Sequence, residues 1–80
     1  MSGNGNGKMR EGFAYVDSAV AAQAREALAS YDGVVVKGVH PSCNDLAEIS
    51  YSSRLTIDAI KSVLDGAVGR DHRYVVGWVE

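Results

Sequence analysis

The chain has little cysteine and proline, no run of basic residues and no long apolar segment. In 80 residues it has one cysteine and one proline, and 8 basic against 10 acidic side chains leave a formal charge of -2. A single cysteine cannot form an internal disulfide, so we expect a cytoplasmic protein. Without a basic run to neutralise phosphates, direct nucleic-acid binding is not expected. No apolar run reaches the roughly 18 residues of a membrane span, so no membrane partner is expected either.

What the chain does contain is typical of one small globular domain. Hydrophobic residues make up 46% of the sequence and charged residues 22%, a balance found in folded domains rather than in disordered chains. Glycine alternates with small polar residues near the start, which predicts a flexible tail over residues 1–9. The remaining stretch, 10–80, is predicted to form a single domain.

Hydrophobic periodicity predicts two helices and four strands. Runs of β-branched and aromatic residues indicate strands at 11–16, 33–39, 46–52 and 73–79. The first helix is predicted over 19–31, with Asp17 and Ser18 as caps and Tyr31 on its buried side. The second follows Thr56 as N-cap and ends at Gly66 or Gly69.

The element order is therefore βαββαβ. Two right-handed βαβ units of this length predict an α+β, ferredoxin-like sandwich. In that fold four antiparallel strands lie in the order 4-1-3-2, and both helices cover one face of the sheet.

Two segments, ALASYDGV (27–34) and AEISYSSRLTIDAIKSVL (47–64), resemble the heavy-metal-associated (HMA-like) domains of metallochaperones and metal-pumping ATPases. The resemblance covers roughly 14–69 and implies the ferredoxin-like fold. That family binds metal through a CxxC motif between the first strand and the first helix. Here the matching positions are Asp17 and Val20, so the chain lacks the thiolates that select Cu(I).

The segment GVHPSCND (38–45) raises the question of a displaced metal site, because it holds His40 and Cys43. Further donors expected at the same end of the fold are His72, Asp17, Asp45 and Asp71. His40 and His72 would lie on opposite edge strands, roughly 14 Å apart at about 4.8 Å per strand, too far for shared zinc ligation. The segment is therefore interpreted as a polar hairpin turn, with His40, Cys43 and His72 as weak metal candidates and no cofactor expected.

No catalytic arrangement is evident from the sequence. His40 and Cys43 are close in sequence, but a nucleophile and base also need an orienting group and a pocket, for which no motif is present. The glycines of GNGNG (3–7) follow no predicted strand, which excludes a dinucleotide fingerprint. The protein is therefore not expected to be an enzyme.

The strands that should have one solvated face are apolar on both faces, apart from the third. This pattern predicts that part of the open sheet face is covered by a partner. Small and β-branched residues should fit under the Ala-rich first helix, which assigns the aromatic residues to the open face. The predicted partner-binding residues are Phe13, Tyr15, Tyr74 and Trp78.

Three classes of function follow. The first is a non-catalytic interaction module that docks on another protein, or on itself as a homodimer, through the open face or an edge strand. One form of this class is an inhibitor of a larger complex, such as an anti-CRISPR or other phage-type anti-defence protein, on grounds of small size and the lack of catalytic residues only. The second class is an HMA-like metal-binding domain with a displaced site. The third is a dimeric sensor of small ligands.

Overall fold

The computed structural model describes residues 9–69 and 72–79. Except for Met9, the tail predicted over 1–9 lies outside the described residues. The candidate ligand Asp71 also lies outside them. The chain forms the strands and helices β1 (Arg10–Asp17), η2 (Ser18–Val20), α1 (Ala21–Ala29), β2 (Val34–Pro41), β3 (Leu46–Ser53), α2 (Ile57–Val68) and β4 (Tyr74–Trp78).

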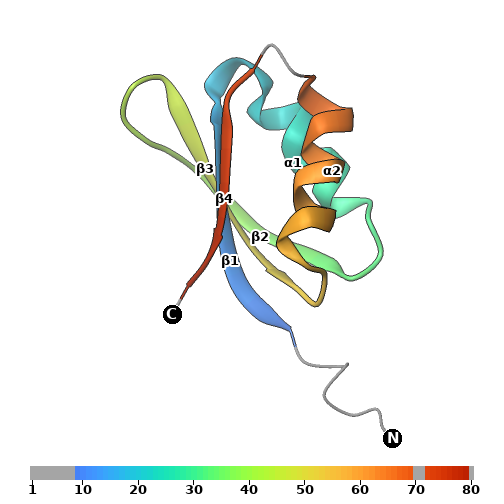
Figure 1. Cartoon of the computed structure of the whole chain (residues 1–80). Helices are drawn as coiled ribbons and strands as arrows, with labels where there is room; N and C mark the ends of the chain where they lie inside the picture. The colour runs from blue at the N-terminus through green and yellow to red at the C-terminus, as the bar shows by residue number, and fades with distance from the viewer. Residues whose placement is uncertain (1–8, 70–71, 80) are drawn as a thin grey trace, which may run out of the picture.

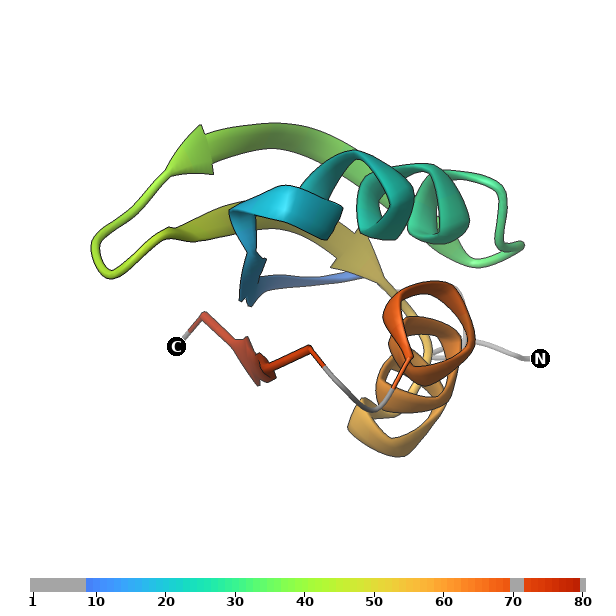
Figure 2. The same cartoon turned by 90° about the horizontal axis from the view of Figure 1, so that it is seen from above.

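The four strands form one antiparallel sheet in the order β2-β3-β1-β4. Both helices lie on the same side of this sheet, while the β2–β3 hairpin extends away from them (Figures 1 and 2). The ferredoxin-like α+β fold predicted from the order of the elements is confirmed. Strand alternation then decides which side chains meet the helices.

The core lies between the sheet and the two helices. Ala14 and Val16 of β1 are fully buried there, and Tyr51 is the largest side chain with no exposed surface. The other buried hydrophobic residues are Val20, Ala21, Ala24, Leu28, Val34, Ala47, Ile49, Ile60, Leu64 and Val68. Ser53, also fully buried, accepts a hydrogen bond from the backbone N–H of Leu55 at 2.9 Å, which gives its hydroxyl oxygen a partner at the turn into α2.

Helix α2 is capped as predicted. The Thr56 side chain accepts a hydrogen bond from the N–H of Ala59 at 3.2 Å. The helix ends at Gly69, whose φ of 79° is reached at little cost by glycine. With twelve residues α2 is the longest helix in the described ranges, and a bilayer span needs about 20.

Two predictions about α1 are wrong. Asp17 and Ser18 do not cap it: Asp17 makes no cap hydrogen bond, and a 3₁₀ turn precedes the helix. Tyr31, placed on the buried side by helical spacing, is 48% exposed. The physical reason is that α1 ends at Ala29, so the periodicity no longer applies at Tyr31.

Candidate interaction surface

The pairing register of β1 fixes which residues face away from the helices. Phe13 is opposite Ser50 on β3 and Gly77 on β4, and Tyr15 is opposite Glu48 and Val75. Directly paired residues in an antiparallel sheet share a face. Because Ala14 and Val16 face the core, Phe13 and Tyr15 lie on the open face, as predicted.

These residues form a continuous apolar patch where β1 meets β4. The rings of Phe13 and Tyr15 meet edge to face, with centroids 5.4 Å apart. Val75 and Val79 are exposed to 60% and 56%, and strand alternation places both on the same face. We call the set Phe13, Tyr15, Val75, Gly77 and Val79 the open-face patch.

The assignment of Tyr74 and Trp78 to the open face is wrong. Both pack against the hydrophobic core on the helix side of β4. Their partners on β1 are Val16 and Gly12, respectively, which belong to the helix-facing row. The Tyr74 hydroxyl donates to Asp65 of α2 at 2.7 Å, which links the start of β4 to that helix.

The reversal has a steric cause. Gly12 has no side chain, and the ring of Tyr51 fills the space above it. The Trp78 ring meets the Tyr51 ring edge to face, with centroids 6.0 Å apart. Arg10 covers the outer side of Trp78, its Cζ lying 4.7 Å from the ring centroid, in cation–π geometry. The glycine on β1 therefore makes room for the Tyr51 ring, against which Trp78 of β4 packs on the helix side.

The open face has the inverse arrangement. Gly77 contributes no side chain there, and Phe13 lies over it: a Cβ built on Gly77 would be 2.8 Å from Phe13 Cζ. Sequence reasoning missed Val75 and Gly77 as members of this surface. The sequence signal for this surface was a glycine on one strand paired with an aromatic residue on the next, because aromatic rings commonly cover the space left by a glycine in a sheet.

Polar groups border the patch on its β3 side. The Tyr15 hydroxyl donates to Glu48 Oε2 at 3.2 Å, and this hydrogen bond to the carboxylate raises the pKa of Tyr15. Farther across the sheet, Lys37 of β2 pairs with Glu11 of β1 at 2.9 Å, above the intervening β3. An apolar centre with a polar margin is the usual anatomy of a protein interface.

The hairpin segment forms a turn and does not gather ligands. The N–H of Ser42 donates to the carbonyl of Leu46, and the N–H of Leu46 to the carbonyl of Cys43. Asn44 and Asp45 have positive φ angles of 58° and 61°, which Asn and Asp tolerate in turns. The Cys43 thiol is free and exposed.

The predicted donors are separated. His40 is on edge strand β2, whereas His72 precedes the opposite edge strand and pairs with Asp17 at 3.3 Å. Within residues 9–69 and 72–79, no group of three or more His, Cys, Asp or Glu side chains could hold a metal ion.

Asp17 is the centre of a polar corner between β1 and β4. Its carboxylate accepts hydrogen bonds from the backbone N–H and the guanidinium of Arg73, at 3.2 and 3.1 Å. Led by the backbone bond, these contacts and that of His72 lower the pKa of Asp17. A cavity of about 510 Å³ adjoins this corner, lined by Asp17, Ser18, Ala19, Asp45, His72 and Arg73.

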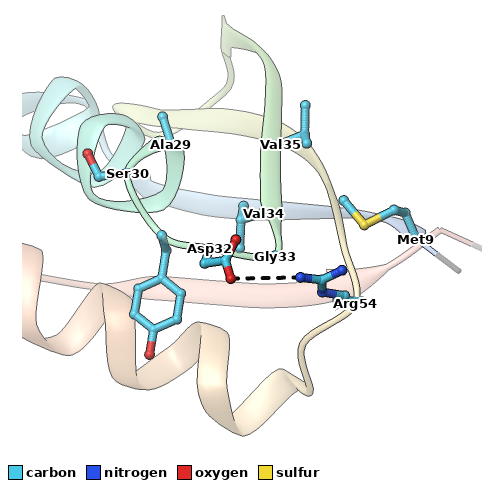
Figure 3. Close-up of a pocket in the computed structure, with 9 residues that line it drawn as sticks. Met9, Ala29, Ser30, Asp32, Gly33, Val34, Val35 and Arg54 are labelled. Carbon is cyan, nitrogen blue, oxygen red and sulfur yellow. Dashed lines mark ion pairs between the residues drawn. The ribbon is translucent and has the colours of Figure 1, made fainter. Parts of the chain in front are cut away.

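A second hollow lies at the other end of the domain, where α1 leads into β2 (Figure 3). Its volume is about 490 Å³, and its lining includes the exposed side chains of Met9, Tyr31 and Val35. Arg54 and Asp32 face each other across it at 3.8 Å. Asp32 is fully exposed, so this ion pair is weak and leaves Arg54 available to an anionic group.

Comparison of the chain with protein-family models, curated proteins and solved structures found no match. The resemblance to HMA-like domains stays a prediction.

Proposed function

We propose that the protein is a small, non-catalytic module that binds another protein through the open-face patch. The observation that carries the proposal is the continuity of Phe13, Tyr15 and Val75 on a sheet face that neither helix covers. Apolar groups gathered in this way, with aromatic residues at the centre, are typical of docking surfaces.

The patch also has a steric basis for recognition. Phe13 is held in place by Gly77 beneath it and Tyr15 beside it, and Tyr15 is oriented by its bond to Glu48. Rings that are ordered before binding lose little conformational entropy on contact. In a narrower form of the proposal, the partner is a larger complex that this protein inhibits, as phage-type anti-defence proteins do; this form rests only on small size and the lack of a catalytic motif in the sequence.

The proposal is tested by capturing the partner from extracts of the source organism with the wild-type protein, then titrating the purified pair. The double variant Phe13→Ser/Tyr15→Ser should bind at least about tenfold more weakly, because aromatic anchors dominate such interfaces. Val35→Ser changes an exposed valine of the same face on β2, outside the patch, and should bind normally. Equal affinity for wild type and a folded double variant would refute the proposal.

A second candidate function is the binding of a small ligand in the hollow of Figure 3. The observation in its favour is Arg54 beside exposed apolar side chains in a space of about 490 Å³, a volume usual for small-molecule sites. A thermal-shift screen with small apolar carboxylates tests it. A stabilisation that Arg54→Ala removes supports this candidate, and the absence of any stabilisation excludes ligands of that class.

A further inference from the structure

The two edges of the sheet differ in how well they are protected against pairing. β2 has a register shift between Val36 and Gly38, carries Lys37 at that point, and ends in Pro41, which has no N–H. Each of these features discourages the addition of another strand. β4 reads Tyr-Val-Val-Gly-Trp and has no such feature.

The free backbone groups of β4 can be assigned from its pairing with β1. The N–H of Val79 donates to the carbonyl of Glu11 at 2.8 Å. Since hydrogen-bonded and non-hydrogen-bonded pairs alternate in an antiparallel ladder, Gly77 and Val75 also direct their N–H and C=O groups toward β1. Val76 and Trp78 direct theirs away from the sheet, where no group of the described residues accepts or donates to them.

We propose that β4 pairs antiparallel with β4 of a second copy of this chain, about a two-fold axis through Val76. The two Val76 residues then exchange two backbone hydrogen bonds, as a hydrogen-bonded pair does. In the same register Val75 lies opposite Gly77 of the second copy. The two four-stranded sheets become one continuous sheet.

The side chains favour a second copy over an unrelated strand. Val75 is 60% exposed, and the register sets it beside a residue without a side chain, under the edge of the Phe13 ring that covers Gly77. A two-fold axis makes this contact twice, each valine meeting the other copy's Phe13. The strand Tyr74–Trp78 contains no charged residue, so the paired copies place no like charges opposite each other.

The inference rests on the proposed function only in treating the domain as an interaction module. The backbone pairing lies at the sheet edge, whereas the partner is proposed to bind the face; Val75, Gly77 and Phe13 contribute contacts to the dimer as well as belonging to the patch. A two-fold axis perpendicular to the sheet leaves both open-face patches on the same side. The dimer would thus present two adjacent docking surfaces and bind a repetitive partner with avidity.

Disulfide trapping tests the register directly. In a Cys43→Ser background, Val76→Cys places two cysteines opposite each other, with Cα atoms about 5.5 Å apart, inside the range that a disulfide bridges. Val75→Cys is the matched control. Residue 75 of one copy lies opposite residue 77 of the other, so the two copies of residue 75 are roughly 8 Å apart, too far for a disulfide. Mild oxidation should give a covalent dimer with Val76→Cys at least about tenfold faster than with Val75→Cys. Equal rates, or no trapping of either, would overturn the register.

Sedimentation of the otherwise unchanged chain over a concentration series provides a measurement that needs no cysteine. Val75→Lys should raise the dimer dissociation constant at least about tenfold, because a charge on an edge strand opposes pairing. Val35 on the protected edge is similarly exposed, at 55%, and Val35→Lys should leave the dissociation constant unchanged. A wild-type protein that stays monomeric overturns the inference but leaves the proposed function standing. If instead the wild type forms the dimer but the Phe13→Ser/Tyr15→Ser variant binds the partner normally, the proposed function is refuted and the dimer stands.

Discussion

The ring of Tyr51 packs directly against the backbone of Gly12: a Cβ built on Gly12 would lie 2.8 Å from the ring carbons and 2.7 Å from the carbonyl oxygen of Gly77. Tyr51 has no exposed surface, so the ring has nowhere to move. The closeness of β1, β3 and β4 at this level of the sheet therefore depends on glycine at position 12.

Gly12→Ala should destabilise the fold by about 1–3 kcal/mol, the usual range for overpacking a filled core. Gly66→Ala is the matched control, because Gly66 lies inside α2 with nothing within 4 Å of its added Cβ. That change should stabilise by about 0.5–1 kcal/mol through helix propensity. Chemical denaturation measures both values, and a neutral Gly12→Ala would show that Tyr51 can yield.

Burial of Tyr51 should make the fold sensitive to alkali. Burial raises the pKa of Tyr51 to about 12, above its ordinary value of about 10. The unfolded chain thus loses this proton first, so the contribution of Tyr51 is complete below pH 10 and is lost as the pH rises toward 12. By linkage the loss is roughly 2–3 kcal/mol. Tyr51→Phe should reduce this loss, as denaturation at neutral and alkaline pH would reveal; equal alkaline sensitivity would contradict the assignment.

The corner around Asp17 should make the fold sensitive to acid. Its pKa is lowered in the folded state, first by the Arg73 N–H, so the ionised form favours folding. The contribution is present above the ordinary value of about 3.9 and disappears as the pH falls through the lowered folded value. Asp17→Asn should therefore lose less stability than wild type between neutral and acidic pH. Asp45→Asn, in the same cavity lining, is the control and should behave like wild type.

The hairpin turn should tolerate replacement of its reactive side chains but lose stability when a residue with positive φ is replaced. His40→Ala and Cys43→Ser should each alter stability by no more than about 0.5 kcal/mol, since both side chains are exposed. Asn44→Val should cost about 1–2 kcal/mol, because a β-branched residue is disfavoured at a φ of 58°. Melting experiments compare the three; a large loss with Cys43→Ser would show that the thiol has a role.

The architecture could be predicted from the sequence because it depends on local patterns. The valine-rich run of β2, the alternation of β3 and the Thr56 cap of α2 each act within a few residues. From these the element order and the sheet order followed. The end of α1 was harder to predict, because Tyr31 continues the helical spacing beyond the last helical residue.

The face of β4 could not be predicted from β4 alone. Val75, Val76 and Trp78 are apolar in both phases of the strand, so alternation is uninformative. What decides the phase is the cross-strand register. Gly12 lies opposite Trp78 and makes room for the Tyr51 ring that Trp78 contacts. Gly77 makes room for Phe13. That information belongs to pairs of residues far apart in the chain, and local patterns do not contain it.

The position of β1 between β3 and β4 also has a consequence for the nascent chain. β4 follows every other strand in sequence, yet it pairs with the first. A ribosome-bound chain that has not yet released Tyr74–Trp78 can assemble β1, β2 and β3, but one side of β1 then remains an open edge, and Phe13 lacks the glycine on which it rests. Closing so distant a pairing is slow compared with forming a local hairpin. During that interval the partly folded domain exposes an unpaired, aromatic strand edge, the kind of surface that makes folding intermediates prone to aggregate.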